Sequence, residues 1–169
     1  MNSKTGSISV LVLTYNEEKN LPHLLESLKG WVNEVCIVDS GSTDRTVEIA
    51  NAFGAQVKVN PFRTQAEQFN WGLENFTFQS DWVMRMDADE LVMPELAAEL
   101  REKLSTFPPS VTGLYVKRRV YFMGRWIRHG AYYPTWLLRI FRIGKAYSEN
   151  RWMDEHLVLI EGTAERLEN

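Results

Sequence analysis

Residues 8–13, with the sequence ISVLVL, are almost continuously apolar, and this limits the folds open to the chain. A strand with one face in water alternates apolar and polar residues, whereas a strand buried on both faces does not. Further short apolar runs follow at residues 35–38, 57–59 and 82–86, and helical patterns separate them. This alternation predicts an α/β fold with a mostly parallel central sheet flanked by helices.

Leucine spacing and end signals mark the helices expected between these strands. Four leucines, Leu21, Leu24, Leu25 and Leu28, recur at helical spacing; Pro22 suits the first turn, and Gly30 suits a C-terminal cap. Further helices are expected near residues 44–53, 64–76 and 94–104. The sheet of such a fold presents ligand-binding groups at the carboxyl ends of its strands.

The second half of the chain is less regular. Strands are expected near residues 112–121 and 135–142, separated by a loop from Gly124 to Pro134. The length of 169 residues suits one domain over residues 1–169. The single Cys36 excludes a disulfide framework and a Cys-based zinc site.

Neither a secretory signal nor a membrane span is visible in the sequence. The first residues, MNSKTGSIS, contain no apolar segment, and no apolar run approaches the roughly 18 residues of a spanning helix. These absences predict a cytoplasmic protein.

The net charge of −3 conceals an uneven distribution along the chain. Residues 117–145 contain eight basic residues and no acidic one, which leaves 11 basic against 22 acidic residues, a charge of −11, elsewhere. Seven aromatic residues are interleaved with these cations: Tyr121, Phe122, Trp126, Tyr132, Tyr133, Trp136 and Phe141.

Three interpretations of residues 117–145 are open. The segment could bind single-stranded nucleic acid, or lie half-buried with its cations reaching the solvent. It could also contact a phosphorylated glycan or a lipid-linked acceptor at the inner, anionic face of the cell membrane. The last two are favoured, and no nucleic-acid partner is expected, because a charge of −11 elsewhere would repel a polyanion.

Asp87-Ala88-Asp89 follows the apolar strand expected at residues 82–86. Two carboxylates in this spacing can hold a hard cation such as Mg²⁺ or Mn²⁺, which usually keeps water and bridges to substrate phosphates. An acidic turn that caps the next helix is the alternative. An EF-hand is excluded, because Leu91 and Val92 occupy positions that need Asp or Asn and Gly.

Polar residues also follow the first two strands. Asp39 ends the second strand, where its carboxylate could bind a ribose or a base N–H, and Gly41 would let the backbone approach a ligand. Thr43 and Asp44 are better explained as caps of the following helix. Tyr15 ends the first strand, where it could stack on a base or plug the sheet edge.

Three segments together resemble family 2 glycosyltransferases of the GT-A fold. They are residues 12–18 (VLTYNEE), residues 37–46 (IVDSGSTDRT) and residues 86–90 (MDADE). The resemblance is close over residues 8–105 and extends to about residue 160. It is strongest to bacterial enzymes that build lipopolysaccharide core, capsule or other surface glycans.

The resemblance implies an inverting transfer of a sugar from a nucleotide-diphosphate donor to a hydroxyl acceptor. By matching position, Tyr15 would stack on the donor base and Asp39 would bind the base or ribose. Asp87 would lie near the donor ribose or sugar, and Asp89, with Asp87, would hold Mn²⁺ or Mg²⁺. The full donor-binding set is Thr14, Tyr15, Asn16, Glu17, Asp39, Gly41, Gln68, Asn70, Asp87 and Ala88.

The chain departs from the family pattern before the metal-binding strand. Many relatives carry Ala-Arg-Asn-x-Gly, whereas this chain has Gln68-Phe69-Asn70-Trp71-Gly72. Phe69 therefore takes the position of the arginine. Arg63 or Gln68 could supply the missing contact.

An inverting transferase also needs a general base for the acceptor hydroxyl. Relatives place an acidic residue in the region of Asp154 and Glu155, and these two are equal candidates. His156 could touch metal or acceptor, although a lone histidine is more often structural.

We therefore expect residues 8–105 to be the nucleotide-sugar-binding half and residues 106–169 the acceptor-side half. Because family members usually continue further, truncation at the C-terminus is an open alternative. A noncatalytic nucleotide-sugar binding module and a nucleic-acid-binding α/β domain are the competing functions.

Overall fold

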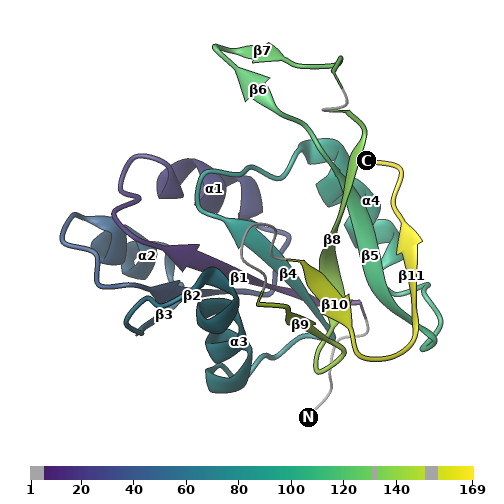
Figure 1. Ribbon diagram of the computed structural model, residues 1–169, viewed down its shortest axis with the longest axis horizontal. Coiled ribbons are helices and arrows are strands. Elements are labelled where there is room, and N and C mark those ends of the chain that lie inside the picture. Colours follow the sequence, from purple (N-terminus) through teal and green to yellow (C-terminus); the bar gives the residue numbers. More distant parts are fainter. Residues whose placement is uncertain (1–5, 131–132, 151–155) are drawn as a thin grey trace.

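A seven-stranded sheet forms the centre of the computed structural model, which describes residues 6–130, 133–150 and 156–169 (Figure 1). The strand order is β11-β5-β8-β4-β1-β2-β3. Within it, β8 runs antiparallel to its neighbours β4 and β5, and the other pairs are parallel. The strands are β1 (Ile8–Thr14), β2 (Glu34–Asp39), β3 (Gln56–Val59), β4 (Trp82–Asp87), β5 (Val111–Arg118), β8 (Thr135–Arg142) and β11 (Thr163–Arg166).

The predicted mostly parallel α/β fold is confirmed, and its N-terminal half is Rossmann-like. In that half β3, β2, β1 and β4 are parallel neighbours, and helices connect them along the chain. The helices are α1 (Leu21–Leu28), α2 (Thr46–Phe53), α3 (Gln65–Asn75) and α4 (Pro94–Lys103). Their bounds agree with the expected ranges to within two residues.

The helices cover both faces of the sheet (Figure 1). One core cluster joins the strands to α1, α2 and α4, and it contains all four leucines of α1. The other cluster lies under α3, where Phe69 packs with Leu11, Val38 and Phe141. Strands covered on both faces have no water-facing side, which explains the continuous apolar run at residues 8–13.

The register of the parallel strands brings the polar strand ends together. Thr14 at the end of β1 pairs with Asp39 at the end of β2, and Leu13 pairs with Asp87 at the end of β4. The three segments that carry the family resemblance therefore meet at one edge of the sheet.

The predictions for the second half need correction. The strand expected at residues 112–121 ends at Arg118, and a hairpin of β6 (Tyr121–Phe122) and β7 (Arg125–Trp126) follows. This hairpin occupies part of the expected loop from Gly124 to Pro134. Strands as short as these carry no readable periodicity, which explains why the sequence did not indicate them.

Three further short strands were also not predicted. A second hairpin pairs β9 (Ala146–Ser148) with β10 (Leu157–Leu159), and β11 adds to the edge of the main sheet beside β5. Among the helices of the described residues, none is long and apolar enough to cross a membrane.

Candidate functional site

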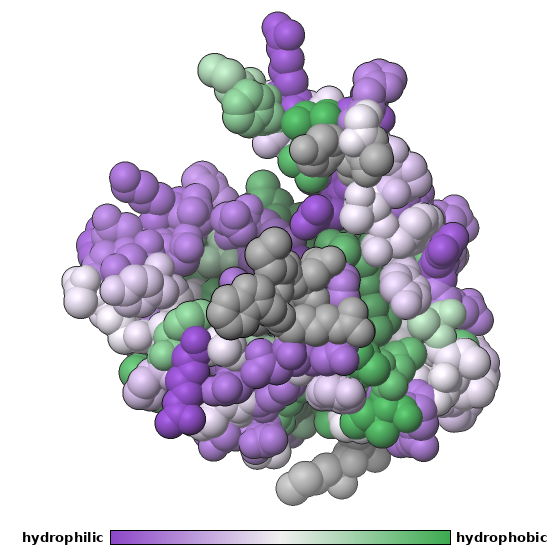
Figure 2. All heavy atoms as spheres, viewed as in Figure 1, coloured by the Kyte–Doolittle hydropathy of each residue, from purple (hydrophilic) through white to green (hydrophobic). Residues whose placement is uncertain are grey.

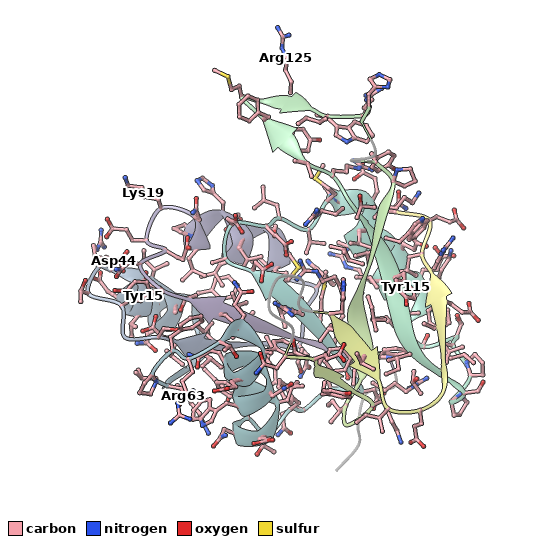
Figure 3. All side chains as sticks on the ribbon, viewed as in Figure 1. Tyr15, Lys19, Asp44, Arg63, Tyr115 and Arg125 are labelled. Atoms are coloured by element: carbon pink, nitrogen blue, oxygen red, sulfur yellow. The ribbon has the colours of Figure 1, made fainter. Side chains whose placement is uncertain are left out.

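The loops that follow β1 and β2 are joined by hydrogen bonds at the sheet edge. Asn16, in the left-handed region at φ 55°, donates its N–H to Ser42 Oγ at 2.8 Å and accepts from the N–H of Thr43 at 2.8 Å. The N–H of Glu17 donates to Thr46 Oγ1 at 2.7 Å. These bonds hold the loop in place, and Tyr15 beside it is 59% exposed (Figure 3).

Asp39 is buried beneath these loops, and its carboxylate accepts four hydrogen bonds. Oδ1 accepts from the N–H groups of Gly41 and Ser42 at 2.9 and 2.8 Å. Oδ2 accepts from the hydroxyls of Thr14 and Ser42 at 2.8 and 2.6 Å. A carboxylate has about four acceptor positions, so all of those on Asp39 are used inside the chain. Gly41, at φ 91°, permits the turn that brings the two N–H groups to Oδ1.

The predicted caps of α2 divide between the two candidates. Asp44 accepts from the N–H and the hydroxyl of Thr46, the first residue of α2, but it lies one residue before the N-cap position, which is Arg45. Thr43 instead bonds Asn16 across the two loops.

Asp87 is the last residue of β4, and Ala88 and Asp89 lie in the turn that follows. Ala88 is buried, Asp87 is half-buried, and Asp89 is exposed. Within the described part of the chain, nothing forms a hydrogen bond or ion pair with the Asp89 side chain. Its carboxylate is therefore available to a ligand from the solvent.

Two arginines contact the Asp87 carboxylate. Arg139 Nη2 lies 3.1 Å from Oδ2, and Arg85 Nε lies 4.0 Å from Oδ1. The same nitrogen of Arg139 lies 2.8 Å from Oε1 of Glu90, whose Oε2 accepts from the N–H of Asp87 at 3.0 Å. Burial raises the pKa of Glu90 above its usual value, and the charge of Asp87 adds to the rise, while Arg139 opposes it.

A β-bulge places Arg139 at this position. Along the β5–β8 pair, Leu114 lies opposite Ile140, but Tyr115 lies opposite Leu138, so Arg139 is the extra residue of β8. A bulge bends the strand and re-aims the side chain of the inserted residue. Here it directs a guanidinium from the middle of an apolar strand to two carboxylates of the β4 turn.

The acidic residues of this turn are too few to surround a metal ion by themselves. They suit a cation that is also coordinated by a bound ligand. No group of three or more histidine, cysteine or acidic side chains that could hold a metal occurs among the described residues. Mg²⁺ often uses one or two carboxylates and completes its shell with water and phosphate oxygens. Asp89 fits this pattern, with Asp87 as a second ligand that Arg139 already pairs.

Gln68 and Asn70, both predicted to bind the donor, make contacts inside the chain. Gln68 is buried, and its Nε2 donates to Ser40 Oγ at 3.0 Å and to the carbonyl of Asn60 at 2.8 Å. Asn70 pairs with the backbone of Ser148 in β9 through two bonds of 2.8 Å. The two side chains therefore join α3 to the end of β2 and to β9.

Phe69 is fully buried and packs edge-on against Phe141, with ring centroids 6.3 Å apart. The guanidinium of Arg85 lies over the Phe69 ring, 5.1 Å from its centroid. A cation is therefore present beside the position where many relatives have arginine, but it comes from β4.

A pocket of about 290 Å³ opens beside the start of α3. Arg63 lines it and is exposed, and among the described residues its side chain makes no ion pair (Figure 3). The pocket adjoins the end of β2 through Gln68. Its lining residues are Asn60, Pro61, Arg63, Glu67, Gln68 and Trp71.

The candidate bases Asp154 and Glu155 lie outside the described residues. They belong to the connection between β9 and β10. Within the described residues on either side, the N–H of Glu149 donates to the carbonyl of His156 at 2.9 Å. Asn70 holds β9 immediately before this segment.

Sequence reasoning missed Arg85, Arg139 and Glu90 as parts of the site. For the two arginines the available signal was a charged residue inside an apolar strand, in WVMRM and in WLLRIF. A buried arginine needs an acidic or hydrogen-bonding partner, but the sequence does not say which partner that is.

Sequence comparison finds relatives among bacterial glycosyltransferases. An uncharacterised glycosyltransferase of Rickettsia bellii is 36% identical over 100 residues, which cover 59% of this chain and 32% of that one. The lipopolysaccharide core biosynthesis glycosyltransferase LpsC of Rhizobium meliloti is 33% identical over 122 residues, covering 69% and 44%. The chain spans about a third of the length of the first of these relatives and under half of the second.

Similar solved structures support the GT-A fold. Glucosyl-3-phosphoglycerate synthase of Mycobacterium tuberculosis in complex with uridine diphosphate has a TM-score of 0.53 and 27% identity, over 68% of this chain and 45% of that one. S. aureus TarS 1–349 has a TM-score of 0.54 and 24% identity, over 81% and 47%, and shows the fold alone. The family model for glycosyl transferase family 2 matches residues 9–161. The chain, with its three strand-end segments at one edge of a GT-A sheet, belongs to glycosyl transferase family 2.

Proposed function

We propose that this chain transfers a sugar from a nucleotide-diphosphate donor to a hydroxyl acceptor, with inversion at the anomeric carbon. The observation that carries the proposal is the register that sets Asp39 and Asp87 on either side of the end of β1. A nucleotide that lies across this edge reaches all three strand-end segments. The synthase of Mycobacterium tuberculosis, with the same fold, was solved with uridine diphosphate.

The donor base would stack on the exposed ring of Tyr15, above the loop that Asn16 and Glu17 hold. Asp39 reaches a base or ribose only if it gives up one of its present bonds. The hydroxyl of Ser42 is the partner that can rotate away without moving the backbone. Thr14 and Gly41 would keep the carboxylate in place during that exchange.

The donor diphosphate would lie beside the β4 turn. Asp89, with Asp87, would hold Mn²⁺ or Mg²⁺, which supplies positive charge to the leaving diphosphate. Arg85 and Arg139 keep the turn in position by pairing with Asp87. Arg63, which is exposed and makes no ion pair among the described residues, would contact the donor from the pocket side.

The acceptor would enter from the second half of the chain. We propose that residues 8–105 bind the donor and residues 106–169 face the acceptor, with Asp154 or Glu155 taking the proton of the attacking hydroxyl. LpsC is named for lipopolysaccharide core biosynthesis, and a bacterial surface glycan or a lipid-linked precursor is the acceptor class that we propose.

A thermal-shift panel of nucleoside diphosphates, with and without Mn²⁺, tests the donor site. A ligand that binds only the folded state raises the melting temperature by mass action. We expect at least one nucleotide to stabilise the chain more strongly with Mn²⁺ than without it. Asp89→Asn should abolish the gain from Mn²⁺ without lowering the melting temperature of the free protein, because the Asp89 side chain is exposed.

Glu102→Gln, which removes an exposed carboxylate from α4, is the matched control and should behave as the unmodified chain. The absence of a shift with any nucleotide would contradict the proposal. A shift without any donor hydrolysis or sugar transfer would favour a noncatalytic binding module instead.

A further inference from the structure

The β6–β7 hairpin protrudes from the rest of the protein and ends in exposed apolar side chains (Figure 1). Tyr121 is 53% exposed, Phe122 67% and Met123 87%. Figure 2 shows apolar and strongly hydrophilic residues side by side at this end of the molecule. Contiguous exposed apolar residues on a protruding element indicate a contact site for a partner protein or a membrane.

The backbone conformation of the turn at the tip disfavours the apolar residue that occupies it. Phe122 pairs with Arg125 across a two-residue turn, in which Met123 has φ 48° and Gly124 has φ 75°. Positive φ at both central residues defines a type I′ turn, where Asn-Gly is preferred and a methionine is strained. The chain thus carries a long apolar side chain at a position where a polar residue would fold better.

Cations lie on the hairpin and at its base. Arg125 points outward from the hairpin (Figure 3). At its base the guanidinium groups of Arg119 and Arg128 lie 5.0 and 4.2 Å from the centroid of Trp126. The segment from residue 117 to residue 145 has no acidic residue, so its field favours a negatively charged surface.

The position of the hairpin connects it to the candidate site. It leaves the sheet between Arg118 of β5 and Thr135 of β8, which pair with each other. Because β8 is antiparallel to β4, this end of β8 lies on the side where β4 ends at Asp87. A surface bound by the hairpin would therefore lie near the edge of the sheet that carries the acidic turn.

We propose that the β6–β7 hairpin inserts Phe122 and Met123 into the headgroup region of an anionic lipid bilayer. Arg118, Arg119, Arg125 and Arg128 bind the lipid phosphates around it. Apolar insertion and electrostatic attraction act together, as in other peripheral membrane segments. The inference goes beyond sugar transfer, since it concerns a surface that needs neither nucleotide nor metal.

Vesicle co-sedimentation without nucleotide is the test. The protein should bind vesicles of phosphatidylcholine mixed with phosphatidylglycerol, bind pure phosphatidylcholine weakly, and lose affinity as salt rises. Met123→Asn should weaken binding about tenfold, because it removes the apolar tip. It creates the preferred Asn-Gly turn, so its melting temperature should be equal or higher. Phe122→Thr should weaken binding similarly, and Arg125→Gln about fivefold.

Ile160→Thr is the matched control. Ile160 is 62% exposed and lies before β11, whose first residue pairs with Val111 at the opposite end of β5 from the hairpin. Its loss should leave vesicle binding unchanged.

Insertion itself can be followed with a fluorophore at the tip. Burial raises the pKa of Cys36, the single cysteine, to about 12, so a Met123→Cys variant can be labelled selectively. The emission of an environment-sensitive dye should shift to the blue on mixed vesicles. Vesicle binding that Met123→Asn leaves unchanged would overturn the proposal, as would hairpin-dependent binding of a single-stranded oligonucleotide without vesicle binding.

Discussion

Arg139 and Asp87 are separated by 52 residues in the sequence and form an ion pair, with 3.1 Å between Nη2 and Oδ2. The side chain of Arg139 is 12% exposed, so water screens the pair only in part. The pair links the bulge of β8 to the turn that carries Asp89. It thereby connects the second half of the sheet to the candidate metal-binding turn.

Removing this arginine should change both stability and metal binding. Arg139→Met leaves Asp87 and Glu90 without their shared cation. The free energy of unfolding should therefore fall by about 1–3 kcal/mol. Mn²⁺ should bind the turn more tightly, because a competing positive charge is gone. Urea denaturation and Mn²⁺ titration by electron paramagnetic resonance measure the two effects. Arg139→Lys keeps the charge and should show a smaller change in each; weaker Mn²⁺ binding by Arg139→Met would contradict the expected competition.

Asp39 should be important for folding as well as for ligand binding. Asp39→Ala removes the acceptor of four hydrogen bonds and should lower the free energy of unfolding by about 3 kcal/mol. Ser42→Ala removes one hydroxyl, which donates to Asp39 and accepts from the Asn16 N–H, and should cost about 1–3 kcal/mol. If Asp39 exchanges the Ser42 hydroxyl for the donor, Ser42→Ala should also retain or improve nucleotide affinity, measured by calorimetry. A large loss of affinity in Ser42→Ala would argue against this exchange.

Asn70 should act through β9 rather than through the donor. Asn70→Asp keeps the shape but replaces the amide that donates to the Ser148 carbonyl, and it should cost about 1–3 kcal/mol of stability. If Asp154 or Glu155 is the base, loosening β9 should lower kcat and leave the KM for the donor nearly unchanged. Steady-state kinetics with varied donor concentration measure both constants. An increase in donor KM at constant kcat would indicate a direct donor contact instead.

Gly72 lets α3 approach the sheet. A Cβ at this position would lie 2.8 Å from Val38 Cγ2 and 3.1 Å from two methyl carbons of Leu11. Gly72→Ala should therefore destabilise the fold by about 1–3 kcal/mol through overpacking. Val38→Ala opens space at the same point, so the double variant should be more stable than the sum of the two single effects. Strict additivity in urea denaturation would show that Val38 does not limit the approach.

Glu99 should make stability fall at low pH. Its buried carboxylate accepts from Lys103 Nζ at 3.0 Å and from the N–H groups of Glu168 and Asn169 at 2.8 and 3.0 Å. Burial alone would raise the pKa of Glu99, but these hydrogen bonds outweigh burial and hold it below its usual value. A carboxyl group with a lowered native pKa contributes stability above its unfolded pKa, about 4.3, and loses the contribution as the pH falls through the native value.

The comparison with Glu99→Gln isolates this contribution. The unmodified chain should be more stable than the variant at neutral pH, and the difference should shrink as the pH falls below about 4. Urea denaturation at a series of pH values measures it. If the stability difference between the unmodified chain and Glu99→Gln grew toward acid pH, the pKa of Glu99 would not be lowered in the folded protein.

The sequence alone was sufficient for the first half of the fold, because local patterns report burial directly. The continuous apolar run of residues 8–13 indicated a strand covered on both faces, and α1 and α3 do lie on opposite faces. Leucine spacing and end signals located helices to within two residues, since helical periodicity and end signals are local. The mostly parallel direction of these strands then followed from the general preference of such alternating segments.

Only the tertiary structure decided which side chains meet. Asn70 bonds a residue 78 positions away, and the bulge at Arg139 depends on the register of β8 against β5. The type I′ turn at Met123 carries a residue that its backbone disfavours, so no hairpin signal is visible there in the sequence. Register and long-range pairing depend on the packing of the whole sheet, whereas periodicity records only whether each segment is buried.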